Sequence, residues 1–341
     1  MKFITASDLR RLSLDVLFAD VLRFLEEDLR RWQKFQKSPR HATHFPHGVF
    51  ELMPCADDAY YTFKYVNAHP GNPASGKLSI VALGMLADVA TGYPQVVCDM
   101  TLLTAVRTAA MSAIAARHLA RPDSAVLGLI GTGAQSEFQT HAMRHVLPIT
   151  TIRYYDRDRS AMAKYARNLE DSGVTLVACA SAEEVVRGAD VLTTCICEKS
   201  RVTLFSYDAV RESDRLFINA IGGDCPGKTE LDPEIMRHSR IVVEYYEQTK
   251  HEGEIQNLEG DTACDEIWEV VQGVKPGRTA DDSLIVFDSV GFALADFAVL
   301  RMLHERNIGM DLDLLPRPEN PKNLISLLRA TDAKRPASRA V

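Results

Sequence analysis

The first part of the chain changes its hydrophobic pattern twice. In residues 8–35 apolar side chains recur at steps of three and four, from Leu14 to Trp32, which predicts an amphipathic helix lying on a surface. Residues 48–100 instead hold short runs rich in β-branched and aromatic residues, separated by Pro, Gly, Asn and Asp, and predict an antiparallel meander. A second helix is expected at 101–119, where Arg107 stands in an otherwise apolar sequence.

From residue 120 onward the pattern is typical of a parallel sheet. Apolar runs of strand length follow one another, and the early ones alternate with helical stretches, as expected for strands buried on both faces. The runs are AVLGLI, TIRYYD, VTLVACA, DVLTTCI, RLFINAIGG, RIVVEYY and SLIVFDSVG. Ser181 and Glu184 have the spacing of a capping box and predict the start of one connecting helix. The fold class is therefore α/β.

The end of the chain departs from this pattern. A helix over about 291–306 closes it, after which Pro316, Pro318 and Pro321 break it. Residues 332–341 are expected to form a frayed tail.

Length and charge narrow the functional classes. With 341 residues the chain is about twice the size of a typical domain, so we expect two domains that share a cleft. The 39 basic and 46 acidic residues give a net charge of −7, which argues against nucleic acid or an anionic membrane as the main partner.

The cysteines and the N-terminal sequence bear on the compartment. The seven cysteines have no disulfide spacing and are interpreted as reduced thiols. The first 32 residues have no uninterrupted apolar region, and no stretch approaches ~18 apolar residues in a row, so we expect a cytoplasmic, unprocessed protein without a membrane span.

A glycine-rich turn, GTGAQS at 131–136, directly follows the strand AVLGLI and opens a helix. Gly131 permits a tight turn, and Gly133 lets the backbone approach a pyrophosphate at the helix N-terminus. Asp156 ends the next strand, where a carboxylate can accept hydrogen bonds from the adenosine ribose and would repel a 2′-phosphate, so NAD is favoured over NADP. Ser136 departs from the usual third glycine, and an ordinary turn followed by a solvated aspartate is the alternative.

A second glycine pair follows the strand LFINA, in GGDCPGKTEL at 222–231. We expect this pair to bring the backbone close to a ligand and to project Asp224 from the carboxyl edge of the sheet, a suitable place for an acid–base group. An aspartate that only caps the next turn is the alternative. Lys228 and Glu230 are either partners in the site or solvated.

Four charged residues lie in or beside apolar stretches of the first domain: Arg40, Glu51, Lys64 and Arg107. A charge there is costly unless it is paired or bound to a ligand. Several cations with one carboxylate suit a zwitterionic amino acid, because Arg and Lys bind a carboxylate while Glu receives an ammonium group. A structural ion pair between Glu51 and one of the cations is the alternative.

Metal and thiol chemistry are not favoured. The histidines at 41, 44, 47, 141 and 145 lack the partners and spacing of a metal site, so no metal is expected. Cys195 and Cys197 are interpreted as buried thiols, and Cys225 is a candidate nucleophile only with a histidine nearby.

With these residues assembled, the chain resembles the ornithine cyclodeaminase and mu-crystallin family, with the greatest similarity to its bacterial cyclodeaminase branch. The resemblance runs over nearly the whole chain. Its segments are RRWQKFQKSPR, ELMP, FKYVN, LADVATGYP, RTAA, ARPDS, GTGAQSEFQ, NAIGGDCPGKTEL, EGEIQ and VFDSVGFALADF. It implies a homodimer whose substrate and dimerisation domain, 1–119 completed by 307–341, joins a Rossmann-type NAD-binding domain at 120–306.

The resemblance also implies roles for individual residues. Asp224 matches the catalytic aspartate. The residues matching the substrate site are Arg40, Lys64 and Arg107, with Glu51 nearby and Val290 lining the pocket. Those matching the cofactor site are Ser79, Arg107, Gly131, Gly133, Ala134, Gln135, Asp156, Ile196, Ile221, Gly222, Gly223, Asp224, Lys228 and Ser289. Ser79 and Ile196 stand where the relatives have threonine, so Ile196 is expected to touch the cofactor only through its backbone or apolar surface.

The implied reaction converts L-ornithine to L-proline and ammonia with NAD as a retained cofactor. Hydride leaves Cα for the nicotinamide, the δ-amine attacks the resulting imine, ammonia departs, and the cyclic imine takes the hydride back. Asp224 would move protons among the amines or activate a water, and the three cations would orient the substrate through its carboxylate. Lysine cyclodeamination, ketimine reduction, amino-acid dehydrogenation and a mu-crystallin-like binding protein are the alternatives.

Overall fold

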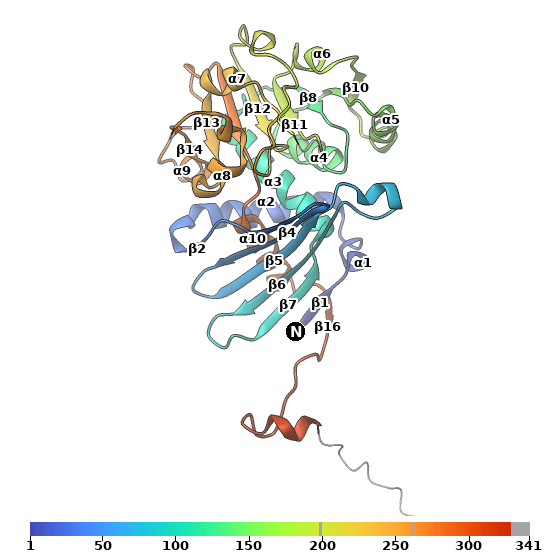
Figure 1. Ribbon diagram of the computed structural model, residues 1–341, viewed down its shortest axis with the longest axis vertical. Coiled ribbons are helices and arrows are strands. Elements are labelled where there is room, and N and C mark those ends of the chain that lie inside the picture. The colour runs from blue at the N-terminus through green and yellow to red at the C-terminus, as the bar shows by residue number, and fades with distance from the viewer. Residues whose placement is uncertain (198–199, 261, 329–341) are drawn as a thin grey trace, which may run out of the picture.

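The structure is a computed structural model that describes residues 1–197, 200–260 and 262–328. It contains two eight-stranded sheets, one mainly antiparallel and one parallel, with helices between them. In Figure 1 the parallel sheet forms the upper part of the molecule, and residues 312–328 extend away from the lower part. The expected tail at 332–341 lies outside the described residues.

The antiparallel sheet has the order β16-β1-β7-β6-β5-β4-β2, with β3 also paired to β4. Its strands are β1 (Lys2–Ile4), β2 (Gln36–Lys37), β3 (His41–Phe45), β4 (Gly48–Ala56), β5 (Tyr60–Ala68), β6 (Ile80–Asp88), β7 (Pro94–Asp99) and β16 (Met310–Asp311). The meander expected at 48–100 is confirmed as β4 to β7. Strand β1 pairs parallel to β7 and antiparallel to β16, so residues 2–4 and 310–311 meet on this sheet.

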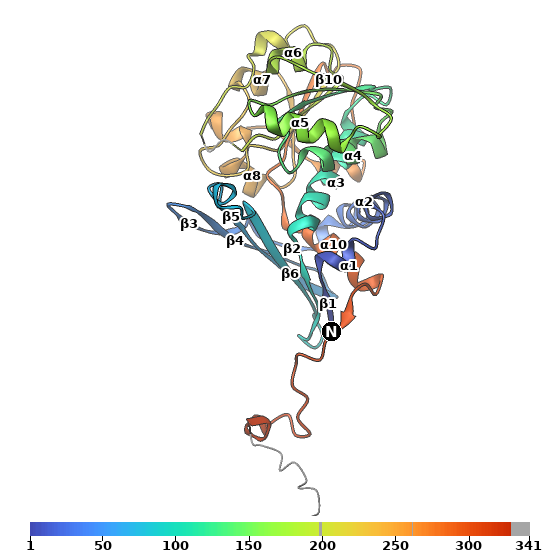
Figure 2. The same ribbon diagram turned by 90° about the vertical axis from the view of Figure 1, so that its right-hand side faces the viewer.

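Helices cover one face of this sheet (Figure 2). These helices are α1 (Ala6–Leu9), α2 (Leu14–Arg30) and α10 (Ala293–Glu305). Three 3-10 turns lie elsewhere in the first and last parts of the chain: η1 (Trp32–Lys34), η2 (Asn72–Ser75) and η5 (Leu324–Leu328). The helix expected over 8–35 is divided, because the Ser13 hydroxyl accepts from the amide of Val16 and starts α2 anew. On the other face of the sheet, Phe50, Leu52 and Leu83 are exposed.

The second sheet is entirely parallel, in the order β10-β9-β8-β11-β12-β15-β13-β14. Its strands are β8 (Val126–Ile130), β9 (Thr151–Tyr155), β10 (Thr175–Ala178), β11 (Val191–Thr194), β12 (Leu216–Ala220), β13 (Arg240–Val243), β14 (Asp265–Glu266) and β15 (Leu284–Asp288). Its helices are α4 (Ser136–Val146), α5 (Arg159–Asn168), α6 (Ala182–Val186), α7 (Pro233–Arg237), α8 (Tyr246–Glu252) and α9 (Ile267–Val271), with η3 (Tyr207–Ala209) and η4 (Glu254–Asn257). The strand order reverses between β8 and β11, where open α/β sheets bind ligands.

Helix α3 (Thr101–Leu119) joins the two sheets, whereas α10 packs on the antiparallel sheet. The predicted helix at 101–119 is confirmed as α3, which contacts α2 on one side and α4 on the other. Helix α10, which the sequence placed with the parallel sheet, packs on α2 and β5 instead. The domain boundaries at 119/120 and 306/307 stay a prediction.

The capping box predicted at Ser181 and Glu184 is formed only in part. Ser181 caps α6 and accepts from the amide of Glu184 as predicted, whereas the Glu184 carboxylate accepts from the amide of Ala180 rather than from the amide of Ser181.

No helix in the described part of the chain is both long enough and apolar enough to cross a membrane.

Candidate functional site

The glycine-rich turn joins the end of β8 to the start of α4 at the carboxyl edge of the parallel sheet. Gly131 has φ +100°, and a Cβ there would lie 2.7 Å from the carbonyl oxygen of Cys195, so only glycine fits without strain. A Cβ on Gly133 would meet nothing within 4 Å, which leaves the backbone open to a ligand. The amide of Ser136 donates to the carbonyl of Gly133, but no side chain caps α4, so the next amide groups of its first turn are available to an anion.

Asp156 organises this turn from the end of β9. Its Oδ2 accepts from the backbone amide of Thr132 at 2.7 Å and from the Thr132 hydroxyl at 3.2 Å. In the same turn, Oε1 of Gln135 is buried without a hydrogen-bond partner among the described residues. An open glycine, an uncapped helix, a carboxylate and an unsatisfied amide oxygen together fit the phosphates and ribose of a dinucleotide.

The second glycine pair lies on two buried carboxylates. A Cβ on Gly222 would be 1.8 Å from Oε1 of Glu230, and one on Gly223 would be 2.6 Å from Oε1 of Glu254. In the structure each glycine lies against one of these side chains, and the predicted approach of the pair to a ligand stays a prediction. The glycines are therefore required for packing, and they set the position of Asp224.

Glu230, Glu254 and Asp288 hold the loops of the carboxyl edge together. Glu254 accepts from the amides of Glu230 and Leu231, Glu230 accepts from the amide of Ile196, and Asp288 accepts from the amide of Ile255. Burial raises the pKa of Glu230 and of Asp288 to about 7 and raises the pKa of Glu254 well above its ordinary value. Each accepted amide fixes one loop to the next.

Asp224 lies at the open side of this edge. Its side chain is 49% exposed, and Oδ1 accepts from Nζ of Lys228 at 2.9 Å. Burial opposes the charged form of Lys228, yet the Asp224 carboxylate raises the pKa of Lys228 above its ordinary value. The sequence left the relation of these two residues open, and the structure brings them into contact.

The charged residues Arg40, Glu51, Lys64 and Arg107 belong to one charge cluster, in which the side chain of Arg40 is buried. Arg40 contacts Glu51 through Nη1 at 3.0 Å and Glu252 through Nε at 3.1 Å. Its Nη2 donates to the carbonyl oxygens of Val290 and Gly291. The alternative given for Glu51, an ion pair with one of the cations, is therefore present.

Two further cations share one carboxylate. Nζ of Lys64 lies 2.9 Å from Oδ2 of Asp296, and Nε of Arg107 lies 3.0 Å from Oδ1. All three side chains are buried, and a Cβ on Gly291 would lie 2.6 Å from the Arg107 guanidinium. The loop at 289–291 thus joins Arg40 to the Lys64–Arg107 pair.

The remaining residues predicted for the cofactor site lie in different loops and differ in their hydrogen bonds. The Ser289 hydroxyl donates to Glu244, which also accepts from the amides of Gly291 and Phe292. The amide of Ile221 donates to the carbonyl of Thr194, and Ser79 lies just before β6, where its carbonyl accepts from His69. Ala134 is part of the glycine-rich turn.

Sequence reasoning missed two acidic residues of the cluster, Glu252 and Asp296. Asp296 stands in an apolar run, the same signal that singled out Arg107, and applying it to α10 would have found this residue. Glu252 lies at the end of α8, and only its tertiary contact with Arg40 distinguishes it from a solvated helix-end acid.

The thiols are only partly as expected. Cys195 Sγ donates to the carbonyl of Gly131, and burial raises the pKa of this thiol. Cys197, expected to be buried, is exposed because it follows the end of β11. Within residues 1–197, 200–260 and 262–328, no three His, Cys, Asp or Glu side chains gather as metal ligands would.

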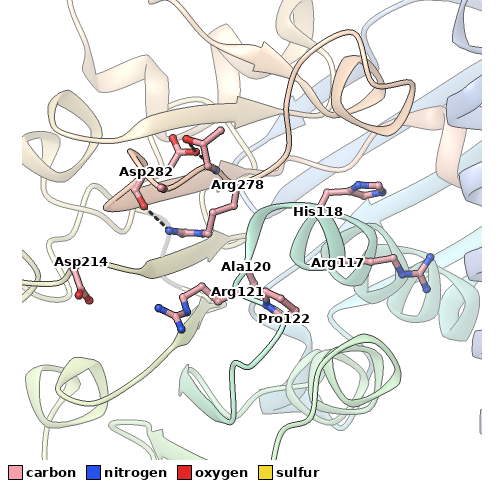
Figure 3. Close-up of a pocket in the computed structure, with 10 residues that line it drawn as sticks. Arg117, His118, Ala120, Arg121, Pro122, Asp214, Arg278 and Asp282 are labelled. Carbon is pink, nitrogen blue, oxygen red and sulfur yellow. Dashed lines mark hydrogen bonds between the residues drawn. The ribbon is translucent and has the colours of Figure 1, made fainter.

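A separate pocket of about 390 Å³ lies at the amino ends of β8, β12 and β15, the edge opposite to the glycine loops (Figure 3). Its arginines are already engaged: Arg278 donates to the carbonyls of Leu119, Leu216 and Asp282, and Arg121 pairs with Asp123. These contacts connect the end of α3 to the first residues of the strands, so we interpret these arginines as structural.

Comparison with known proteins agrees with this architecture. Residues 7–310 match the model of the ornithine cyclodeaminase/mu-crystallin family. The chain is 47% identical to the ornithine cyclodeaminase of Agrobacterium fabrum, over 92% of this chain and 89% of that protein.

Solved structures are similar over the same length. A dimeric archaeal alanine dehydrogenase with bound NAD has a TM-score of 0.84 and 35% identity, and covers 92% of this chain and 99% of its own. A lysine cyclodeaminase, described in its recognition of L-lysine, L-ornithine and L-2,4-diaminobutyric acid, has a TM-score of 0.84 and 30% identity, and covers 94% and 97%. The family match and these similarities establish that the chain belongs to the ornithine cyclodeaminase/mu-crystallin family.

Proposed function

We propose that the protein converts L-ornithine to L-proline and ammonia, with NAD as a catalytic cofactor. The observation that carries this proposal is the uneven charge of the cluster. Lys64 and Arg107 share one carboxylate, which leaves positive charge for a substrate carboxylate. Arg40 faces Glu51 and Glu252, which leaves negative charge for ammonium groups. A diamino acid has the complementary distribution.

In this proposal Lys64 and Arg107 have one role and Asp224 has another. Lys64 and Arg107 hold the substrate carboxylate and so direct Cα toward the loop of Asp224. Asp224 accepts and returns protons at the substrate amines. NAD, when bound, supplies the acceptor for a hydride from Cα and returns that hydride after ring closure. The 47% identity to an enzyme that bears the ornithine cyclodeaminase name supports the same substrate.

The proposal is tested by incubating the protein with L-ornithine and sub-stoichiometric NAD, with L-lysine in parallel. We expect proline and ammonia in equal amounts, far in excess of the NAD supplied, without lasting NADH. Steady NADH formation would show a dehydrogenase instead. Faster turnover of lysine would show that the pocket prefers the longer chain.

For the cofactor, we propose that the turn Gly131–Gln135 and the N-terminus of α4 hold the pyrophosphate and that Asp156 binds the adenosine ribose. We expect Asp156→Ser to raise the NADP-to-NAD affinity ratio about tenfold or more, because the carboxylate that repels a 2′-phosphate is gone. Fluorescence titration with each dinucleotide measures this ratio. Asp171→Ser, at an exposed position, is the control. An unchanged ratio in Asp156→Ser would refute the ribose contact.

Lys64 gives the site a pH dependence. Burial, with Arg107 beside it, lowers the pKa of Lys64 to about 8, while Asp296 opposes this shift. The side chain is charged below this pH and neutral above it, so we expect KM for ornithine to rise about tenfold per pH unit above pH 8 as the attraction for the carboxylate is lost. Lys64→Arg stays charged and should flatten the rise.

The measurement is KM against pH from about pH 7 to 9.5 in both proteins, with the ratio of the two KM values taken at each pH. Titration of the substrate's own amines is common to both proteins and cancels in this ratio. A ratio that does not change with pH would contradict the assignment.

We also propose that the protein is a homodimer in which the exposed face of the antiparallel sheet packs on a second copy. Phe50, Leu52, Tyr61, Val81 and Leu83 give this face its apolar character, and the similar archaeal alanine dehydrogenase is a dimer. Sedimentation analysis of Leu83→Asp should show a monomer, and a dimer in that variant would place the interface elsewhere. The cytoplasmic location and a role in proline biosynthesis and ornithine degradation stay predictions.

A further inference from the structure

Glu252 is a buried carboxylate for which the mechanism above has no use beyond charge. It ends α8, and its Oε2 lies 3.1 Å from Nε of Arg40. Both carboxylate oxygens of Glu51 accept from Nη1 of the same arginine, at 3.0 and 3.2 Å. Two carboxylates therefore share one guanidinium. Glu252 contacts it through one oxygen only, whereas Glu51 uses both.

The end of α8 is fixed against the loop that bears Asp224. One amide nitrogen, Nε2 of Gln256, donates to the carbonyl oxygens of Glu252 at 2.8 Å, Lys228 at 3.0 Å and Cys225 at 3.3 Å. Burial raises the pKa of Glu252 to about 7, with Arg40 opposing and the charges of Glu51 and Asp224 adding to the rise. A carboxyl group with such a pKa takes up and releases a proton readily at neutral pH.

The proposed reaction needs two proton acceptors. Both amines of ornithine arrive as ammonium groups, since unperturbed alkylamines have a pKa of about 10. The α-ammonium must lose a proton before a hydride leaves Cα, and the δ-ammonium must lose one before its nitrogen can attack. Asp224 accepts the first proton, and once protonated it cannot accept the second.

We propose that Glu252 is the second acceptor, which takes the proton of the δ-ammonium group and so frees that nitrogen to close the ring. This inference rests on the proposed function. The N–H bond breaks and its proton passes to Glu252. The nitrogen lone pair then forms the new C–N bond at the imine carbon, and the C=N π electrons return to the α-nitrogen.

The remaining protons balance without any net oxidation or reduction in this step. A proton of the ring nitrogen passes to the α-nitrogen, which leaves as ammonia with the electrons of its C–N bond, and the ring nitrogen forms the cyclic imine. The protons held by Asp224 and Glu252 end on ammonia and on proline.

The test separates ring closure from the step before it. Glu252→Gln, loaded with NAD, is mixed rapidly with ornithine while NADH absorbance and proline are followed. We expect NADH to form at a rate within about tenfold of wild type while proline formation falls about 100-fold or more, so that NADH accumulates on the enzyme. Higher pH should restore proline formation, because free δ-amine then no longer needs an acceptor. Glu247→Gln, exposed on the same helix and paired with Lys250, is the matched control.

Two further measurements exclude a general defect. Glu252→Gln should reduce the preformed cyclic imine with NADH at a rate within about tenfold of wild type, since the ring is already closed. Glu252→Asp, which keeps a carboxylate, should retain more proline formation than the amide variant. Proline formation by Glu252→Gln within about tenfold of wild type, or equal losses of NADH formation and proline, would overturn the inference. A wild-type protein that makes no proline would overturn the proposed function and this step with it.

Discussion

Replacement of Asp224 by asparagine is expected to lower kcat for ornithine by about 10³-fold or more while NAD binds with nearly unchanged affinity. Asparagine has the same size and can still accept the hydrogen bond from Lys228, so the loop over Glu230 and Glu254 keeps its shape. It cannot take up a proton, so the α-ammonium group of the substrate loses the acceptor it needs before a hydride can leave Cα.

Steady-state proline formation and a NAD titration measure the two quantities in the Asp224→Asn variant. Asp214→Asn, at an exposed aspartate paired with Arg215, is the control and should retain wild-type turnover. A kcat of Asp224→Asn within about tenfold of wild type would remove Asp224 from the acid–base role.

Replacement of Asp296 by asparagine is expected to destabilise the fold by about 3–5 kcal/mol. Lys64 and Arg107 are both buried, and Asp296 is the carboxylate they share. Its removal leaves two like charges without compensation, which costs far more than the loss of a surface ion pair. The variant should also bind ornithine more weakly, because the shift of Lys64 toward its neutral form removes attraction for the carboxylate.

Urea unfolding measures the free energy in Asp296→Asn and in a matched control, Glu305→Gln, on the same helix. Glu305 is 43% exposed and pairs with Arg301, so its loss should cost about 1 kcal/mol or less. Adding Lys64→Met to Asp296→Asn should recover part of the stability, since one unpaired cation is then replaced by an apolar chain. A loss of less than about 1 kcal/mol in Asp296→Asn would contradict the shared-carboxylate account.

Local pattern predicted the elements whose neighbours are near in sequence. The helix at 101–119, the meander of β4 to β7 and the glycine-rich turn after β8 depend on periodicity, hairpin pairing and backbone freedom, all of which are local. Strands β1 and β16 are three and two residues long and pair through Lys2 with Asp311 and Phe3 with Met310, so no local signal marks them. The partner of α10 was likewise set by tertiary packing on α2 and β5.

The residues of the site also divide into those with a local sequence signal and those identified only by a tertiary contact. Arg40, Lys64 and Arg107 stood out because a charge in an apolar stretch needs a partner, and each has one. The identity of those partners did not follow from the sequence, because Asp296 is 232 positions from Lys64 and Glu252 reaches Arg40 only through the fold. The glycine pair at 222–223 shows the limit most clearly: Glu230 and Glu254 lie in motifs of the sequence, but their burial against these glycines is a tertiary contact that the motifs do not predict.

The most direct test of the central claim is to follow the hydrogen on Cα. Ornithine deuterated at Cα is converted in the presence of excess unlabelled NAD, and the proline formed is analysed by mass spectrometry. The account predicts proline that keeps its deuterium at C2, because the hydride is returned within the same site. Proline with ordinary hydrogen at C2, or deuterium that appears in free NADH, would contradict it.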